Sequence, residues 1–188
     1  RRKLREEIFG GLSFIQSNAA VRSFFVLLAG SVIFMMAPWI VLGPQIAKEQ
    51  AGATGSQTTL LFAMLGVGQF LTSMLIMRYN HLMVKKGLWF MCGLCWGSSV
   101  QMLLGQSSSI IMMGLFLFAW GMGGGFYMNL SQTLIQHNTP PQVMGRVMAI
   151  HSLLMSGLAP AGALAVGVIA RSTNTAPWTF TICGFLML

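Results

Sequence analysis

A few amides that interrupt long apolar stretches are the groups in this sequence best able to do chemistry. Amides that face hydrocarbon are costly, so their side of a helix is expected to face protein or water. These amides have two interpretations. In the first, they line a cavity, where they hydrogen-bond a small molecule or gate the cytoplasmic opening of the cavity. In the second, they hydrogen-bond neighbouring helices. Spacings of four, four, three and four put one such set on a single helix face: Gly121, Gly125, Asn129, Gln132 and Gln136.

A second polar face lies on an earlier apolar stretch. Gly66, Gln69 and Ser73 share one side of a helix, and Gln69 falls near the middle of the stretch. The same two interpretations apply to Gln69 and Ser73. On the next stretch Gln101 shares a side with two glycines, and helix packing is the better explanation there.

Large aromatic and sulfur side chains offer walls for an apolar binding site. Trp39 and Trp120 are candidates to line such a path, although aromatic residues are also ordinary at membrane interfaces. The 16 Met residues suit a pocket for varied apolar ligands, with lipid-facing filler as the alternative for most of them. Pro38, Pro44 and Pro160 predict kinks in their helices.

Ionisable groups are nearly absent from the apolar stretches. The only acids are Glu6, Glu7 and Glu49, which all lie outside them. Proton relays in membranes usually use carboxylates, so coupling would need His151 or a carboxylate outside this sequence. His151 lies five residues after Arg146, or about 7–8 Å deeper in a helix. It either titrates or stays neutral and bonds a nearby carbonyl, and the second is favoured.

No pattern of an enzyme or metal site is present. The sequence contains neither Gly-x-Ser-x-Gly nor His-Glu-x-x-His. Cys92 and Cys95 form a C-x-x-C pair without a second ligand pair, and thiols suit a membrane helix as small apolar fillers. We therefore expect no catalytic residue, no metal and no cofactor.

The elements that carry these residues have the length of membrane spans. About 20 apolar residues cross the hydrocarbon of a bilayer as a helix. With 55% hydrophobic and 7% charged residues, the chain is not a water-soluble domain. A sixth stretch at 178–188 is too short to span, so we expect a fragment of a longer protein. The predicted spans follow an amphipathic linker at 1–22 and make up the bundle at 23–188: 23–46, 58–77, 87–104, 110–136 and 147–170.

Positive charge alternates between the connections. Of the 11 Lys and Arg residues, only Lys48 and Arg171 lie on the connections opposite to the N-terminus. Positive residues collect on the cytoplasmic side, so the N-terminus is expected there. The net charge of +8 then reflects topology and contact with anionic lipid headgroups, with no nucleic-acid partner.

The segment from Thr139 to Val147 carries a family resemblance. Its sequence, Thr-Pro-Pro-Gln-Val-Met-Gly-Arg-Val, resembles the loop that opens helix eleven in exporters of the major facilitator superfamily. The pattern is most similar to the branch of the enterobactin exporter and the macrolide-efflux-like proteins. Between the second and third spans, the family's Gly-x-x-x-Asp-Arg-x-Gly-Arg-Arg motif is reduced to Lys85-Lys86.

The resemblance implies an all-α membrane protein, a six-helix half bundle containing helices seven to eleven and the start of helix twelve. A missing N-terminal half of the same protein would be its partner, with a small-molecule substrate bound between the halves. Helices seven, eight, ten and eleven would line the cavity, which favours Gln69, Asn129 and Gln132 as substrate contacts. Candidates for a cytoplasmic gate lie at the basic ends of the spans: Lys85, Lys86, Gly145, Arg146 and His151.

The function expected from the resemblance is export. The chain would belong to a proton-coupled secondary transporter of the bacterial inner membrane, which exports small amphipathic molecules such as siderophores or drugs by alternating access. The alternative is a permease or scaffold subunit that acts with a partner complex such as an ATPase. The inner connections of about nine residues are short for docking such a partner.

Overall fold

The computed structural model describes residues 2–173 and 176–188, without the side chains of residues 2–9, 82, 169 and 171–173. All regular structure in this part of the chain is helical. The helices follow one another in this order: α1 (Arg2–Ser17), α2 (Ala19–Ser31), the π-helical turn η1 (Val32–Met36), α3 (Ala37–Ala51), α4 (Gly55–Tyr79), the 3₁₀ turn η2 (Asn80–Leu82), α5 (Lys86–Leu104), α6 (Ile110–His137), α7 (Pro141–Thr173) and α8 (Ala176–Met187).

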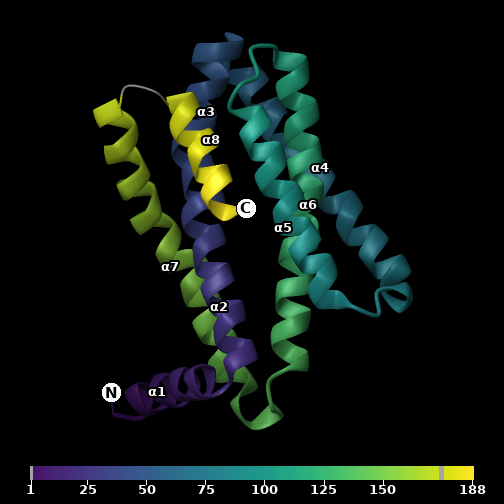
Figure 1. Ribbon diagram of the computed structural model, residues 1–188, viewed down its shortest axis with the longest axis vertical. Coiled ribbons are helices and arrows are strands. Elements are labelled where there is room, and N and C mark those ends of the chain that lie inside the picture. The colour runs from purple at the N-terminus through teal and green to yellow at the C-terminus, as the bar shows by residue number, and fades with distance from the viewer. Residues whose placement is uncertain (1, 174–175) are drawn as a thin grey trace.

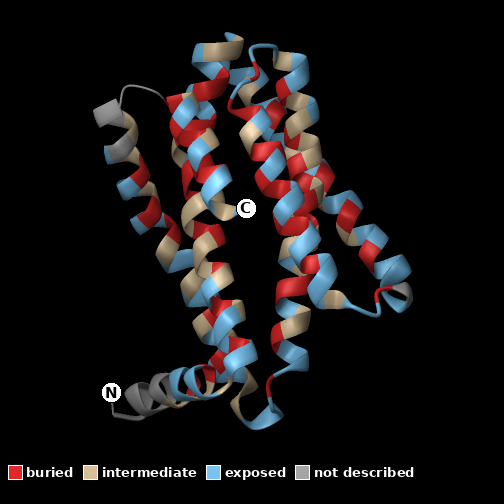
Figure 2. Cartoon of the chain, viewed as in Figure 1, coloured by how far each residue is buried: buried red, intermediate tan, exposed pale blue. Residues whose placement is uncertain are grey.

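Five of the described helical segments are long and apolar enough to cross a membrane. They are α2 to α3 taken together, α4, α5, α6 and α7, whereas α8 is a shorter apolar helix. Exposed residues occur along all of these helices (Figure 2). Many of them are large and apolar, as on α4, where Phe70 is 67% and Met77 is 79% exposed. Water would make this surface strongly unfavourable, so its natural solvent is lipid.

The long helices form two packed groups (Figure 1). Helix α6 packs against both α4 and α5, while α3 packs against α7, and α8 contacts both α3 and α5. Helix α1 lies across one end of the bundle, where it contacts α2 and α7. A methyl group on Gly11 of α1 would approach Ile150 Cδ1 to 2.8 Å, so this contact is close.

Glycines allow the backbones of α4 and α6 to touch. A methyl group on Gly121 would overlap the carbonyl group of Leu65, and one on Gly68 would overlap the carbonyl oxygen of Phe118. A methyl group on Gly125 would lie 2.6 Å from Thr72 Cβ. In lipid, helix association depends on this kind of close approach, so the glycines of the predicted polar face serve the α4–α6 contact.

Two of the prolines that were expected to kink their helices lie within continuous helices. Pro44 is inside α3, and Pro160 is inside α7. The π-helical turn η1 instead lies directly before Pro38. Helix α7 begins at Pro141, so Gly145 and Arg146 lie in its first turns. Proline suits this first position because its missing N–H would have no helical partner there.

Candidate functional site

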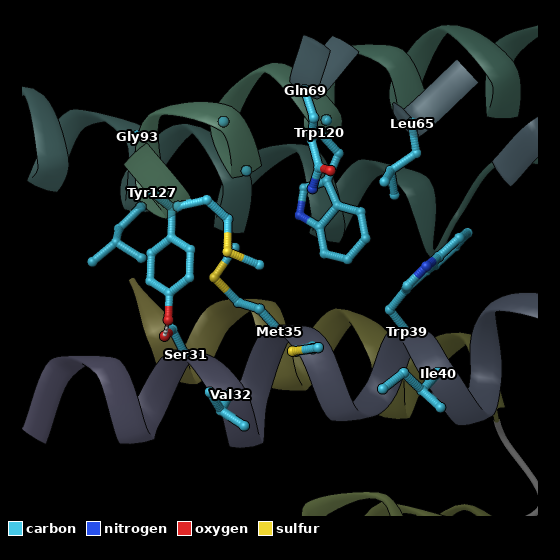
Figure 3. A pocket seen from close by; sticks show the side chains of 16 residues that line it. Ser31, Val32, Met35, Trp39, Ile40, Leu65, Gln69, Gly93, Trp120 and Tyr127 are labelled. Carbon is cyan, nitrogen blue, oxygen red and sulfur yellow. Dashed lines mark hydrogen bonds between the residues drawn. The ribbon is translucent and has the colours of Figure 1, made fainter. Parts of the chain in front are cut away.

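A cavity of about 220 Å³ lies between the α2–η1–α3 segment and helices α4, α5 and α6 (Figure 3). Its lining contains no Lys, Arg, Asp, Glu or His side chain. Methionines from η1 and α6 form part of the wall, and glycines of α5 and α6 form another part. The side chains with aromatic or polar groups are these: Ser31, Trp39, Gln69, Trp120 and Tyr127.

Two tryptophans form a rigid aromatic corner of this cavity. The rings of Trp39 and Trp120 meet edge to face, with centroids 5.3 Å apart, and both residues are buried. Gly43 makes room for the Trp39 ring, because a methyl group on Gly43 would lie 2.6 Å from Trp39 Cε3. Edge-to-face pairs are favourable, so the corner is preformed before any ligand arrives.

The hydroxyl groups at the other end of the cavity already form hydrogen bonds within the protein. The Ser31 hydroxyl donates to the Tyr127 hydroxyl at 2.7 Å, and the Tyr127 hydroxyl donates to Met155 Sδ at 3.7 Å. These contacts link α2, α6 and α7. The Ser31 and Tyr127 hydroxyl groups therefore hold the shape of the cavity more than they offer free hydrogen-bonding groups to a ligand.

Gln69 lines the cavity with a side-chain amide that no described residue hydrogen-bonds. The amide points into the cavity beside Trp120 (Figure 3). Its Nε2 atom lies against Gly124, where an added methyl group would approach it to 3.0 Å. No side-chain hydrogen bond of Gln69 occurs within the described residues. A bound molecule can thus receive or donate a hydrogen bond here.

The other predicted cavity residues lie outside the lining of this cavity. Asn129 donates from Nδ2 to Ser73 Oγ at 2.9 Å and to the Gly125 carbonyl at 2.8 Å. Ser73 in turn donates to the Gln69 carbonyl at 2.8 Å. The bond between Asn129 and Ser73 joins α6 to α4, which is the interhelical role that the sequence left open. Gln132 is exposed.

We predict that Asn129→Ala and Ser73→Ala each reduce the unfolding free energy by about 1 kcal/mol, because each breaks the bond between α4 and α6. The double variant should lose less than the sum of the two, since both single changes remove the same bond. Denaturant titration in detergent measures this, with exposed Gln132→Ala as the control. Strict additivity would contradict a shared interhelical bond.

The π-helical turn that carries Met35 and Met36 into the cavity wall depends on Gln101. Pro38 has no N–H and cannot bond the Phe34 carbonyl four residues before it, as a helix otherwise requires. Fully buried Gln101 supplies the donor, since its Nε2 bonds the carbonyls of Phe34 at 2.9 Å and Phe180 at 3.3 Å. The sequence signal was Pro38 within a span, because it frees the Phe34 carbonyl, which a polar side chain of another helix can then bond.

The gate candidates fall into two separate places. Lys85 is exposed just before α5, and half-buried Lys86 begins that helix. Exposed Arg146 lies on α7 against α1, where a methyl group on Gly10 would approach Arg146 Nη1 to 2.9 Å. No ion pair or hydrogen bond connects the two lysines with Arg146 in the part of the chain described.

Gly145 and His151 complete the gate set on α7. Exposed Gly145 has open space around it, because an added methyl group would meet no atom within 4 Å. His151 is buried, at 5% exposure, and its Nε2 atom has no hydrogen-bond partner. We expected His151 to be neutral and to bond a nearby carbonyl, but its Nε2 atom makes no such hydrogen bond with the described residues.

These features define a class of protein: a polytopic helical membrane protein with an uncharged, aromatic cavity between its helices. Within the described residues, no group of three or more His, Cys, Asp or Glu side chains is placed to hold a metal ion. The three cysteines are free, with Cys92 and Cys95 exposed and Cys183 buried.

Comparison with known families identifies the chain further. The family model of the Major Facilitator Superfamily matches residues 20–188, and the chain belongs to this family of membrane transporters. The predicted fold class, an all-α membrane protein with a half bundle of this type, is thereby confirmed. No curated protein and no solved structure matches the chain.

Proposed function

We propose that this chain forms the substrate cavity of a proton-coupled secondary exporter of small amphipathic molecules, such as siderophores or drugs, in the bacterial inner membrane. The proposed branch is that of the enterobactin exporter and the macrolide-efflux-like proteins, on the resemblance of the segment Thr139–Val147. The observation that carries the proposal is the cavity itself, with its tryptophan corner and the single free amide of Gln69.

The lining suits a ligand with a large apolar surface and a hydrogen-bonding group. Trp39 and Trp120 supply flat apolar walls, while Met35, Met36 and Met128 supply flexible ones. Thioethers adapt to different shapes, so the site tolerates related ligands. Gln69 gives the ligand one orientation, because a hydrogen bond to this half-buried amide favours poses that place a polar atom beside it.

Transport then follows from movement of this bundle against the other half of the protein. We place the substrate at the cavity of this bundle, on the side that would meet the other half, and rocking would expose it to one side of the membrane at a time. Lys85, Lys86, Gly145, Arg146 and His151 are the proposed residues of the cytoplasmic gate. His151 is the candidate coupling group within this chain, because it is buried and its Nε2 atom is unpaired. A carboxylate outside this sequence is the other candidate.

The test is efflux by the full-length protein with Gln69 changed to Ala. We predict at least a fivefold fall in the efflux rate of an amphipathic dye, because one hydrogen bond is worth about 1 kcal/mol. The exposed Gln132→Ala change serves as the matched amide control. Equal efflux by wild type and Gln69→Ala, at equal protein levels, would remove Gln69 from the site.

A further inference from the structure

A second hollow lies beside the central cavity and shares Gly93 and Gly123 with its lining. This groove, of about 190 Å³, runs between α5 and α6 and is apolar along its length. Its exposed rim includes Trp89, which is 42% exposed, and Trp96, which is 53% exposed. Cys92 lies between them, and Met122 and Phe126 of α6 form the facing wall.

The walls of the groove are fixed by contacts within the protein. The Trp89 and Phe126 rings are stacked, with centroids 6.0 Å apart and planes 12° from parallel. Trp96 donates from Nε1 to the Ala119 carbonyl at 2.8 Å, so its polar group is satisfied and its ring serves as an apolar wall. The groove is therefore a preformed apolar channel.

Positive charge stands at one end of this channel. Trp89, Cys92 and Trp96 are spaced by three and four residues along one face of α5, and Lys85 is the residue directly before this helix, four positions before Trp89. Lys85 is exposed and Lys86 follows it at the positive end of the α5 dipole. Neither α5 nor α6 contains an Asp or Glu that would neutralise these lysines.

The distance from Lys85 to the far end of the channel at Trp96 fits one leaflet of a bilayer. Lys85 and Trp96 are 11 positions apart, which is about 16 Å at the rise of a helix. Half of a hydrocarbon core is about 15 Å thick. An occupant must therefore be apolar over a leaflet and negatively charged at the surface.

We propose that the groove between α5 and α6 binds an anionic phospholipid, with one acyl chain against Trp89, Cys92 and Trp96 and its phosphate held by Lys85 and Lys86. The Trp89 indole N–H has no hydrogen-bond partner within the described residues and lies one turn from Lys85. It can donate to an ester oxygen of the same lipid. This lipid site does not rest on the proposed transport function, although its lining shares Gly93 and Gly123 with the central cavity.

Two cysteines on α5 provide the test. Cys92 lies in the groove, whereas Cys95, one turn away, is exposed but outside it. The full-length protein in detergent is treated with N-ethylmaleimide, and the modification of each cysteine is followed by peptide mass. Added phosphatidylglycerol should slow alkylation of Cys92 at least threefold and leave Cys95 unchanged, while phosphatidylcholine with the same chains should slow neither.

Variants separate the headgroup from the acyl chain. In the double variant Lys85→Gln and Lys86→Gln, protection of Cys92 by phosphatidylglycerol should be lost, whereas Lys48→Gln should retain it. Equal protection by both lipids would overturn the proposal, as would protection of Cys95. Protection by glycerol phosphate alone would indicate a plain anion site, and protection that rises with protein concentration would indicate a second copy, and either result would reject the lipid.

Discussion

Gly121→Ala is expected to lower the unfolding free energy by about 3 kcal/mol or more, which is the upper range for overpacking a close contact. The added methyl group would overlap the Leu65 carbonyl, which belongs to the α4 backbone and has no rotamer by which to move away. The helices would have to separate along their whole contact. Thermal and denaturant unfolding in a mild detergent measure the loss.

Gly66→Ala is the matched control for this change. Gly66 lies on α4, and a methyl group there would meet no atom within 4 Å. Since alanine is the better helix former by about 1 kcal/mol, this variant should be as stable as wild type or slightly more so. If Gly121→Ala and Gly66→Ala unfold at the same temperature, the close α4–α6 contact does not exist in the protein.

Gln101→Leu should produce the second large loss, of about 2–3 kcal/mol, and should also reduce transport. Leucine is similar in size but leaves the carbonyls of Phe34 and Phe180 without this donor in an apolar interior. The π-helical turn would lose its anchor, and Met35 would shift in the cavity wall. Stability and the affinity for an exported dye measure the two effects separately.

Pro38→Ala provides the check on this mechanism. Alanine restores an N–H four residues after Phe34, which can bond the carbonyl that Gln101 otherwise satisfies. The double variant Pro38→Ala and Gln101→Leu should therefore be more stable than the sum of the single changes predicts. Simple additivity would show that Gln101 does not act through the Phe34 carbonyl.

Much of the architecture could be predicted from the sequence because lipid imposes strong rules on it. A span needs about 20 apolar residues, and backbone groups must bond within the helix. The structure accordingly has helices over each predicted span, although α7 begins at Pro141 and the helix from α2 to α3 extends over Ala19–Ala51. The segment Thr139–Val147 also indicated the family, which the family model confirms.

The roles of the polar residues were harder to predict from the sequence. The spacing on α6 put Gly121, Gly125 and Asn129 on one face, and the structure has the glycines against α4 and Asn129 bonded to Ser73. Of the residues predicted to line the cavity, Gln69, Trp39 and Trp120 lie in the lining of the central cavity, and Ser73, Asn129 and Gln132 do not. Spacing shows which residues share a side, but every side of a helix in a bundle faces something different.

The sequence by itself determined the membrane class, the helices, the family and the alternation of positive charge, because these depend on composition and local order along the chain. Only the tertiary structure decided which amide is free in the cavity, which amides hold helices together, and that Gln101 supports the proline-broken turn. A hydrogen bond between helices joins residues up to 96 positions apart. Its partner is set by how the helices pack, and local spacing carries no record of that.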